Sequence, residues 1–230
     1  MQNNTIFLKR YTGDDEAFRI NEREVWRYSG CKASENIADG ELRAVYNEVI
    51  RNMKNKLSYK VCYRRMEIEW ADRLPLLPFS SESNDLARCL RGCKEIVLFA
   101  ATIGLEPDRY IARYQRFSPV RALLMQAYGA ERVECLCNVF CDEIKELVAA
   151  EGLSCTARFS PGYGDLPLDI QKDLFRLLDC NRQIGISLNE SLLMTPSKSV
   201  TAIFGIGPCV GSHHEHKCEN CKNTDCEFRA

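Results

Sequence analysis

Four cysteines and three histidines lie close together near the end of the 230-residue chain. Cys218 and Cys221 form a CxxC pair, and Cys226 follows after a short loop. The CxxC spacing brings two thiolates within reach of one metal ion, and a third cysteine leaves one ligand of a tetrahedral site to be supplied. The residues that could supply it are Cys209, His213, His214 and His216.

The ligand types leave two kinds of metal centre open. Zinc accepts four cysteines or three cysteines and a histidine, and an iron–sulfur cluster accepts four cysteines. Beyond Val210 the segment has few large apolar side chains, so metal binding would have to supply the free energy that orders it. The alternative is a thiol-rich tail that takes up metal only adventitiously.

A second candidate site is the loop Arg158-Phe-Ser-Pro-Gly-Tyr163. Pro161 and Gly162 suit the central positions of a type II turn, and the glycine lets a ligand approach the backbone closely. Arg158, at the end of a predicted strand, can hold a carboxylate through two parallel hydrogen bonds. Tyr163 offers an aromatic face to a planar base or a cation. Taken alone, the loop also fits a surface turn with a structural arginine.

The remaining composition excludes several classes of function. Lys plus Arg (31) nearly equals Asp plus Glu (32), which argues against a general nucleic-acid binder. No histidine precedes His213, so a Ser-His or Cys-His pair would require the tail to fold back. The chain has no Walker loop and no Asp-x-His-x-x-Gly signature of a cobalamin-binding module.

The chain shows no sign of a membrane span or an export signal. The uncharged stretch Ile96–Leu105 is far shorter than the roughly 20 apolar residues of a membrane helix. The N-terminus lacks the basic and apolar regions of a signal peptide, which predicts a cytoplasmic protein with reduced thiols.

The elements that must position these residues follow from the apolar spacing. Helical periodicity predicts helices over 42–57, 83–90, from about 107 and from Pro119 to Leu147, and over 168–179. Strands are predicted over 59–70 with a bend at Arg64-Arg65, and over 95–102, 155–159, 186–193 and 200–206, the last two as an antiparallel hairpin. Helices and strands do not alternate strictly, which favours an α+β fold with an antiparallel sheet.

At the Arg158 loop the sequence resembles a known family. The stretches Arg158–Asp165, Gln171–Leu178, Ile186–Ser191 and Met194–Ser199 are similar to the activation domain of cobalamin-dependent methionine synthase, particularly to its free-standing bacterial relatives. The same resemblance extends upstream to Leu86–Lys94, Phe99–Gly104 and Glu24–Tyr28, and covers roughly residues 20–206.

The resemblance implies a twisted antiparallel sheet flanked by helices over residues 1–206. The Cys/His spacing adds a second unit, a metal-binding tail over 207–230. The resemblance also implies that the domain binds S-adenosylmethionine and presents it to oxidised cobalamin on a partner module. An electron, from flavodoxin or another donor, and the methyl group would then restore methylcobalamin. This makes the chain part of a methyltransferase system in methionine biosynthesis that depends on a second chain.

Carried over by motif, the resemblance assigns S-adenosylmethionine to Arg158, Ser160 and the Gly162-Tyr163 turn. An acidic residue on the preceding long helix completes the family's set, and Glu134 is the candidate by local pattern. The family's further tyrosine, on a strand after the Ser-Lys-Ser element, is missing, and the Cys/His tail stands in its place.

Three functions therefore remain open. The first is the accessory component of a split methionine synthase. The second is a reductive activator of another corrinoid methyltransferase that uses an iron–sulfur centre in its tail. The third is a non-enzymatic docking module with a metal-bearing tail. For the metal of the tail, the redox role that the resemblance implies favours an iron–sulfur cluster over zinc.

Overall fold

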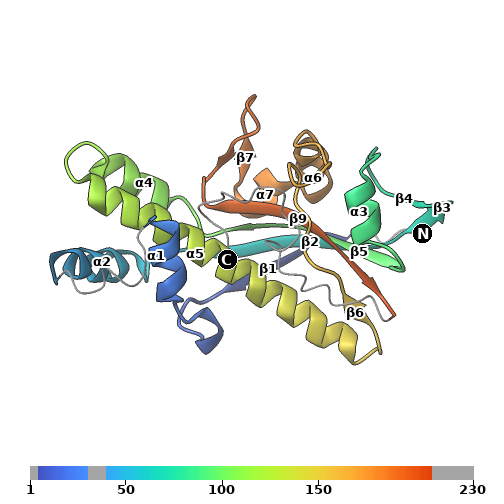
Figure 1. The fold of residues 1–230 in the computed structure, drawn as a ribbon, viewed down its shortest axis with the longest axis horizontal. Helices are drawn as coiled ribbons and strands as arrows, with labels where there is room; N and C mark the ends of the chain where they lie inside the picture. Colours follow the sequence, from blue (N-terminus) through green and yellow to red (C-terminus); the bar gives the residue numbers. More distant parts are fainter. Residues whose placement is uncertain (1–4, 31–39, 209–230) are drawn as a thin grey trace.

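A five-stranded antiparallel sheet forms the centre of the computed structural model, which describes residues 5–30 and 40–208 (Figure 1). The strand order is β1-β2-β5-β9-β6, and every neighbouring pair is antiparallel. The strands of this sheet are β1 (Phe7–Tyr11), β2 (Tyr59–Glu67), β5 (Glu95–Thr102), β6 (Ser154–Cys155) and β9 (Ser199–Gly207). Two small hairpins pair β3 (Glu69–Ala71) with β4 (Leu74–Leu76) and β7 (Ser187–Leu188) with β8 (Met194–Thr195).

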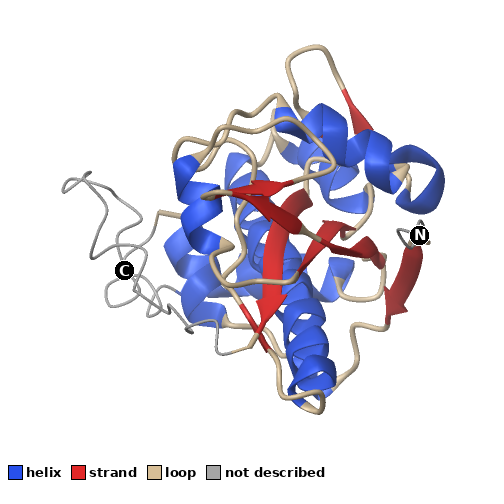
Figure 2. Ribbon diagram, turned by 90° about the vertical axis from the view of Figure 1, so that its right-hand side faces the viewer, coloured by secondary structure: helices blue, strands red, loops and turns tan. Residues whose placement is uncertain are grey.

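Helices cover both faces of the sheet (Figure 2). They are η1 (Glu16–Phe18, a 3-10 turn), α1 (Glu22–Tyr28), α2 (Gly40–Met53), α3 (Asn84–Cys89), α4 (Glu106–Tyr114), α5 (Pro119–Ala149), α6 (Ile170–Leu178) and α7 (Cys180–Ile184). The central strand β5 shows why both faces are covered, since its side chains alternate between two apolar cores. Ile96 and Leu98 pack with α6, and Val97 and Phe99 pack with α5.

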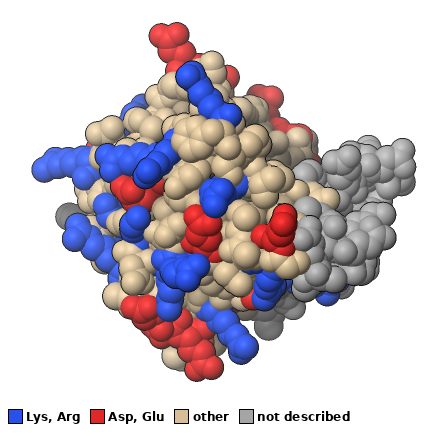
Figure 3. Space-filling model, turned by 90° about the vertical axis from the view of Figure 1, so that its left-hand side faces the viewer, with Lys and Arg blue, Asp and Glu red and all other residues tan. Residues whose placement is uncertain are grey.

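The N-terminal half of α5 extends beyond the sheet and forms a third apolar cluster with α1 and α2. Trp26 stacks on Tyr46 there, with ring centroids 4.9 Å apart. The outer surface of this end, seen in Figure 3, carries many Lys and Arg side chains around a few acidic ones. In the part of the chain that the structure describes, no helix is long and apolar enough to cross a membrane.

The α+β architecture with an antiparallel sheet is confirmed, together with the helices at 84–89, 106–114, 119–149 and 170–178. One predicted pairing is wrong: the segments 186–193 and 200–206 do not form a hairpin. Instead β7 pairs with β8, and β9 pairs with β5 and β6. The predicted strand over 59–70 is divided at Ile68 into β2 and β3, and β2 continues without a break through Arg64 and Arg65, which pair in register with β5.

Gly129, inside α5, has a packing role. A Cβ atom at this position would lie 3.0 Å from Cγ of Lys198, so the glycine lets the helix approach the start of β9 closely.

Candidate functional site

The loop after β6 adopts the turn that its sequence predicts. The Tyr163 amide donates to the Ser160 carbonyl oxygen at 3.1 Å, and Gly162 has φ of 85°, as the third position of a type II turn requires. The ring of Tyr163 packs edge-on against Phe159, with centroids 5.9 Å apart, and stays half exposed. The loop therefore presents one aromatic face to solvent.

Arg158 turns to the opposite side of this loop and meets α5. Its Nη2 donates to Glu134 Oε2 at 3.0 Å and to Asn138 Oδ1 at 2.9 Å. Glu134 and Asn138 are four residues apart on a helix, so they lie on the same face one turn apart. Both hydrogen bonds leave from one nitrogen, Nη2, and they hold the guanidinium against α5.

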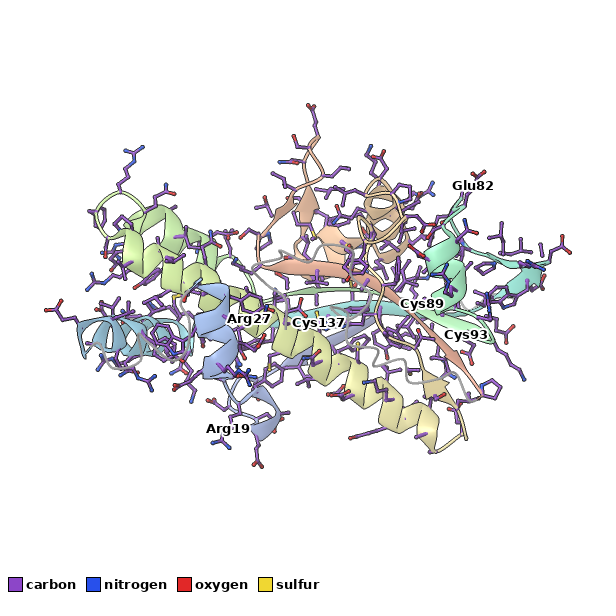
Figure 4. All side chains as sticks on the ribbon, viewed as in Figure 1. Arg19, Arg27, Glu82, Cys89, Cys93 and Cys137 are labelled. Carbon is purple, nitrogen blue, oxygen red and sulfur yellow. The ribbon has the colours of Figure 1, made fainter. Side chains whose placement is uncertain are left out.

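Burial and neighbouring groups act in opposite directions on this guanidinium. Burial lowers the pKa of Arg158, but the Cys137 thiol and the Glu134 carboxylate raise it, and the pKa ends above its ordinary value. Cys137 lies on the sheet-facing side of α5 (Figure 4), and burial raises the pKa of its thiol. Arg158 is therefore a permanent cation beside a neutral thiol.

Glu134 and Asn138 also line an acidic groove of about 610 Å³. It lies between α5 and the N-terminal segment that carries η1 and α1. Figure 1 shows α1 next to α5. Arg19 is its one basic lining residue. Its acidic lining residues are Asp15, Glu24, Glu131, Glu134, Asp142, Glu143 and Glu146. Five of these carboxylates already form ion pairs with basic residues outside the lining, and Asp15 and Glu146 form none within the described residues. The acidic lining still favours a cationic group over an anionic one.

A buried ion pair holds the N-terminal wall of the groove in place. Arg132 is 1% exposed and donates to Glu131, to the Phe18 carbonyl oxygen at 2.6 Å and to the Arg19 carbonyl oxygen at 3.2 Å. Glu131 in turn accepts a hydrogen bond from the Asn21 amide at 3.0 Å. The pair thus ties the chain between η1 and α1 to the long helix.

Asp165 anchors the other end of the loop to α3. Its carboxylate accepts hydrogen bonds from the Ser83 hydroxyl, from the Asn84 amide at 2.8 Å and from the Asp85 amide at 3.2 Å. These bonds to the first residues of α3 hold the pKa of Asp165 below its ordinary value. The loop is therefore fixed at Arg158 by α5 and at Asp165 by α3.

Replacing Asp165 by asparagine is expected to lower the melting temperature at pH 7 by about 2–4 °C, as the loss of a helix cap does in a domain of this size. Because the folded-state pKa is depressed, the stabilisation exists above the unfolded-state pKa and is lost as pH falls through the folded-state pKa. The difference between wild type and Asp165→Asn should vanish in strong acid, as scanning calorimetry at several pH values would show.

The matched control is Asp169→Asn, because Asp169 stands at the N-cap of α6 without a side-chain capping bond. This control should melt like wild type. Equal melting of Asp165→Asn and wild type at pH 7 would contradict the assignment.

The predicted site residues fall into two groups. The structure brings Arg158 and Glu134 into contact, and it places Ser160, Gly162 and Tyr163 in one turn next to them. The predicted metal ligands lie outside the described residues: Cys209, His213, His214, His216, Cys218, Cys221 and Cys226. Within 5–30 and 40–208, no group of three or more His, Cys, Asp or Glu side chains could hold a metal ion.

A family model described as the activation domain of vitamin B12-dependent methionine synthase matches residues 91–225, more than half of the chain. The chain belongs to this activation-domain family. The match includes β5, α5, the Arg158 loop and β9, whereas η1, α1 and α3 lie outside the matched residues.

A solved structure supports the same architecture. The activation-domain chain is similar to a crystal structure of the MetH reactivation domain bound to AdoHcy, with a TM-score of 0.67 and 13% sequence identity. The similarity covers 87% of this chain and 78% of the other. At that identity it shows the fold, which confirms the expected α+β class. No curated protein matches the chain.

Sequence reasoning missed Asn138, Asp165 and the acidic groove. Asn138 follows Glu134 by one helical turn, and the acidic residues of α5 recur at helical spacing on the same stripe. That periodicity could have predicted an acidic face on this helix. Nothing local to Asp165 predicts its partners, because they lie about 80 residues earlier.

Proposed function

We propose that this activation-domain chain binds S-adenosylmethionine beside Arg158 and takes part in the reductive remethylation of cobalamin on a partner protein. The observation that carries the proposal is the Arg158 guanidinium, which is held by Glu134 and Asn138, two residues that also line the acidic groove. Family membership and the AdoHcy held by the structurally similar MetH reactivation domain support the ligand class.

The charges around the loop match the groups of this ligand. S-adenosylmethionine carries a carboxylate, an ammonium, a sulfonium and a planar adenine. The Arg158 guanidinium suits the carboxylate, and the acidic groove suits the two cations. Tyr163 has an exposed ring on which adenine can stack.

The proposed reaction requires cobalamin from a second chain. The partner's cobalamin would supply the acceptor: a reductant such as flavodoxin would provide one electron, the sulfonium of the bound ligand would give up its methyl group, and S-adenosylhomocysteine would be released. The part of this chain is to hold the sulfonium at the rim of the groove, where a partner can reach it. The partner is a cobalamin-binding module of methionine synthase or of another corrinoid methyltransferase, and methyl transfer with each purified module would distinguish the two.

Replacing Arg158 by alanine is expected to weaken S-adenosylmethionine binding by about 1.5–3 kcal/mol, the range for hydrogen bonds to charged groups. This equals roughly 10- to 150-fold in the dissociation constant. Arg158→Lys should restore little of it, because an ammonium cannot reproduce the planar donor pattern. Isothermal titration calorimetry measures the dissociation constant for wild type, Arg158→Ala and Arg158→Lys.

Arg176→Ala is the matched control, since Arg176 is an exposed arginine on α6 that pairs with Asp173 rather than with a loop residue. Its affinity should equal that of wild type. Equal binding by wild type and Arg158→Ala, or no binding by wild type with or without the cobalamin module, would reject the proposed site.

A further inference from the structure

The strand β9 ends beside a hollow at the end of α3. β9 ends at Gly207, where a Cβ atom would lie 2.6 Å from the Gly92 carbonyl oxygen and 2.9 Å from Cys93 Cα. Figure 1 shows β9 running to the side of the sheet on which α3 and the β3–β4 hairpin lie. The backbone at Gly207 therefore contacts the backbone at Gly92 and Cys93, and a residue with a Cβ atom at position 207 would not fit.

The hollow itself has a volume of about 730 Å³. It is lined by Trp70, Asp72, Arg73, Arg91, Gly92 and Cys93. Trp70 is held across it, because its Nε1 donates to the Cys93 carbonyl oxygen at 3.1 Å. Figure 4 shows Cys93 just beyond α3, at the same end of the molecule.

The lining has an excess of positive charge. Arg73 and Arg91 are both exposed, and neither forms an ion pair with another residue in the described ranges. Asp72 offsets one of the two charges. An anionic segment with an apolar or thiol-bearing part would therefore complement this surface.

We infer that residues 209–230 of this same chain dock in the hollow lined by Trp70, Arg73, Arg91 and Cys93. Cys209 follows Gly207 by two residues, so the chain keeps it within about 7 Å of Gly207, beside the hollow. The segment carries four carboxylates and three basic side chains.

This inference does not depend on S-adenosylmethionine binding, and hydrogen–deuterium exchange on the full-length protein tests it. Amides of residues 209–230 should exchange more slowly than those of a free peptide of the same sequence. In Arg73→Glu/Arg91→Glu they should exchange roughly tenfold faster than in wild type, as expected when two exposed charge pairs are reversed. Acrylamide should also quench Trp70 more strongly in this variant, while the buried Trp26 contributes little.

The control is Arg116→Glu, which reverses an exposed arginine between α4 and α5, at the other end of the molecule, and should leave tail exchange unchanged. Metal content is measured in each protein. Tail protection that the double variant leaves intact shows a tail that folds by itself without docking, and overturns the inference. Unprotected wild-type tail amides overturn it as well. Protection that falls on dilution together with a dimer in native mass spectrometry assigns the hollow to the tail of a second copy, and also overturns it.

Discussion

Replacing Arg132 by methionine is expected to lower the free energy of unfolding by about 3–5 kcal/mol, because breaking a buried ion pair leaves the other charge without a partner. Arg132 and Glu131 are 1% and 4% exposed. The substitution also leaves the Phe18 and Arg19 carbonyl oxygens without their donor. Urea unfolding followed by circular dichroism measures the change.

The double variant Glu131→Gln/Arg132→Met separates the charge from the packing. It removes both charges, and it should be less destabilised than the sum of the two single variants. Arg109→Met is the control, because Arg109 forms an exposed pair with Glu106 and should change stability by less than about 0.5 kcal/mol. A loss below about 1 kcal/mol in Arg132→Met would show that the pair contributes no more than a surface contact.

Changing Cys218 and Cys221 together to serine is expected to remove the tail metal completely. We propose that these two cysteines and Cys226 ligate one metal centre, with Cys209 or a histidine completing it. Without the CxxC pair two of the four ligands are lost, and the free energy that orders the segment, about 10–16 kcal/mol for structural zinc in small peptides, is lost with them.

Elemental analysis of anaerobically purified protein checks this result. Wild type should contain about one zinc ion, or several irons with matching sulfide. Cys135→Ser is the control, because Cys135 is a partly exposed cysteine on α5 and should retain the metal. A double variant with the metal content of wild type, or wild type without metal, would rule out the centre.

The two candidate sites meet at α3. The Arg158 loop is bound to its first turn through Asp165, and Cys89 in its last turn donates to the Ala157 carbonyl oxygen at 3.5 Å. The hollow that we assign to the tail begins at Gly92, just past this six-residue helix, which is about 9 Å long. A tail docked as inferred would therefore begin within about the length of α3 of the proposed S-adenosylmethionine loop.

Local features of the fold could be predicted from the sequence. The helix from Pro119 follows from apolar residues at helical spacing, because each turn of a helix repeats its burial. The turn at Pro161-Gly162 follows from the conformations that these two residues favour. The motif around Arg158 was sufficient to predict the family, and the match over residues 91–225 confirms that prediction.

Only the tertiary structure decided which distant residues meet. The segments 186–193 and 200–206 have the alternation of strands, but alternation does not specify a partner, and β9 pairs with β5, about a hundred residues earlier. Arg158 contacts Glu134 and Asn138 because the edge of the sheet crosses α5 at that point. The Cys/His spacing alone predicts the chemistry of the tail. Where the tail begins, beside Gly92 and Cys93, depends on strand pairing, since contacts between residues far apart in sequence form only when the whole sheet is assembled.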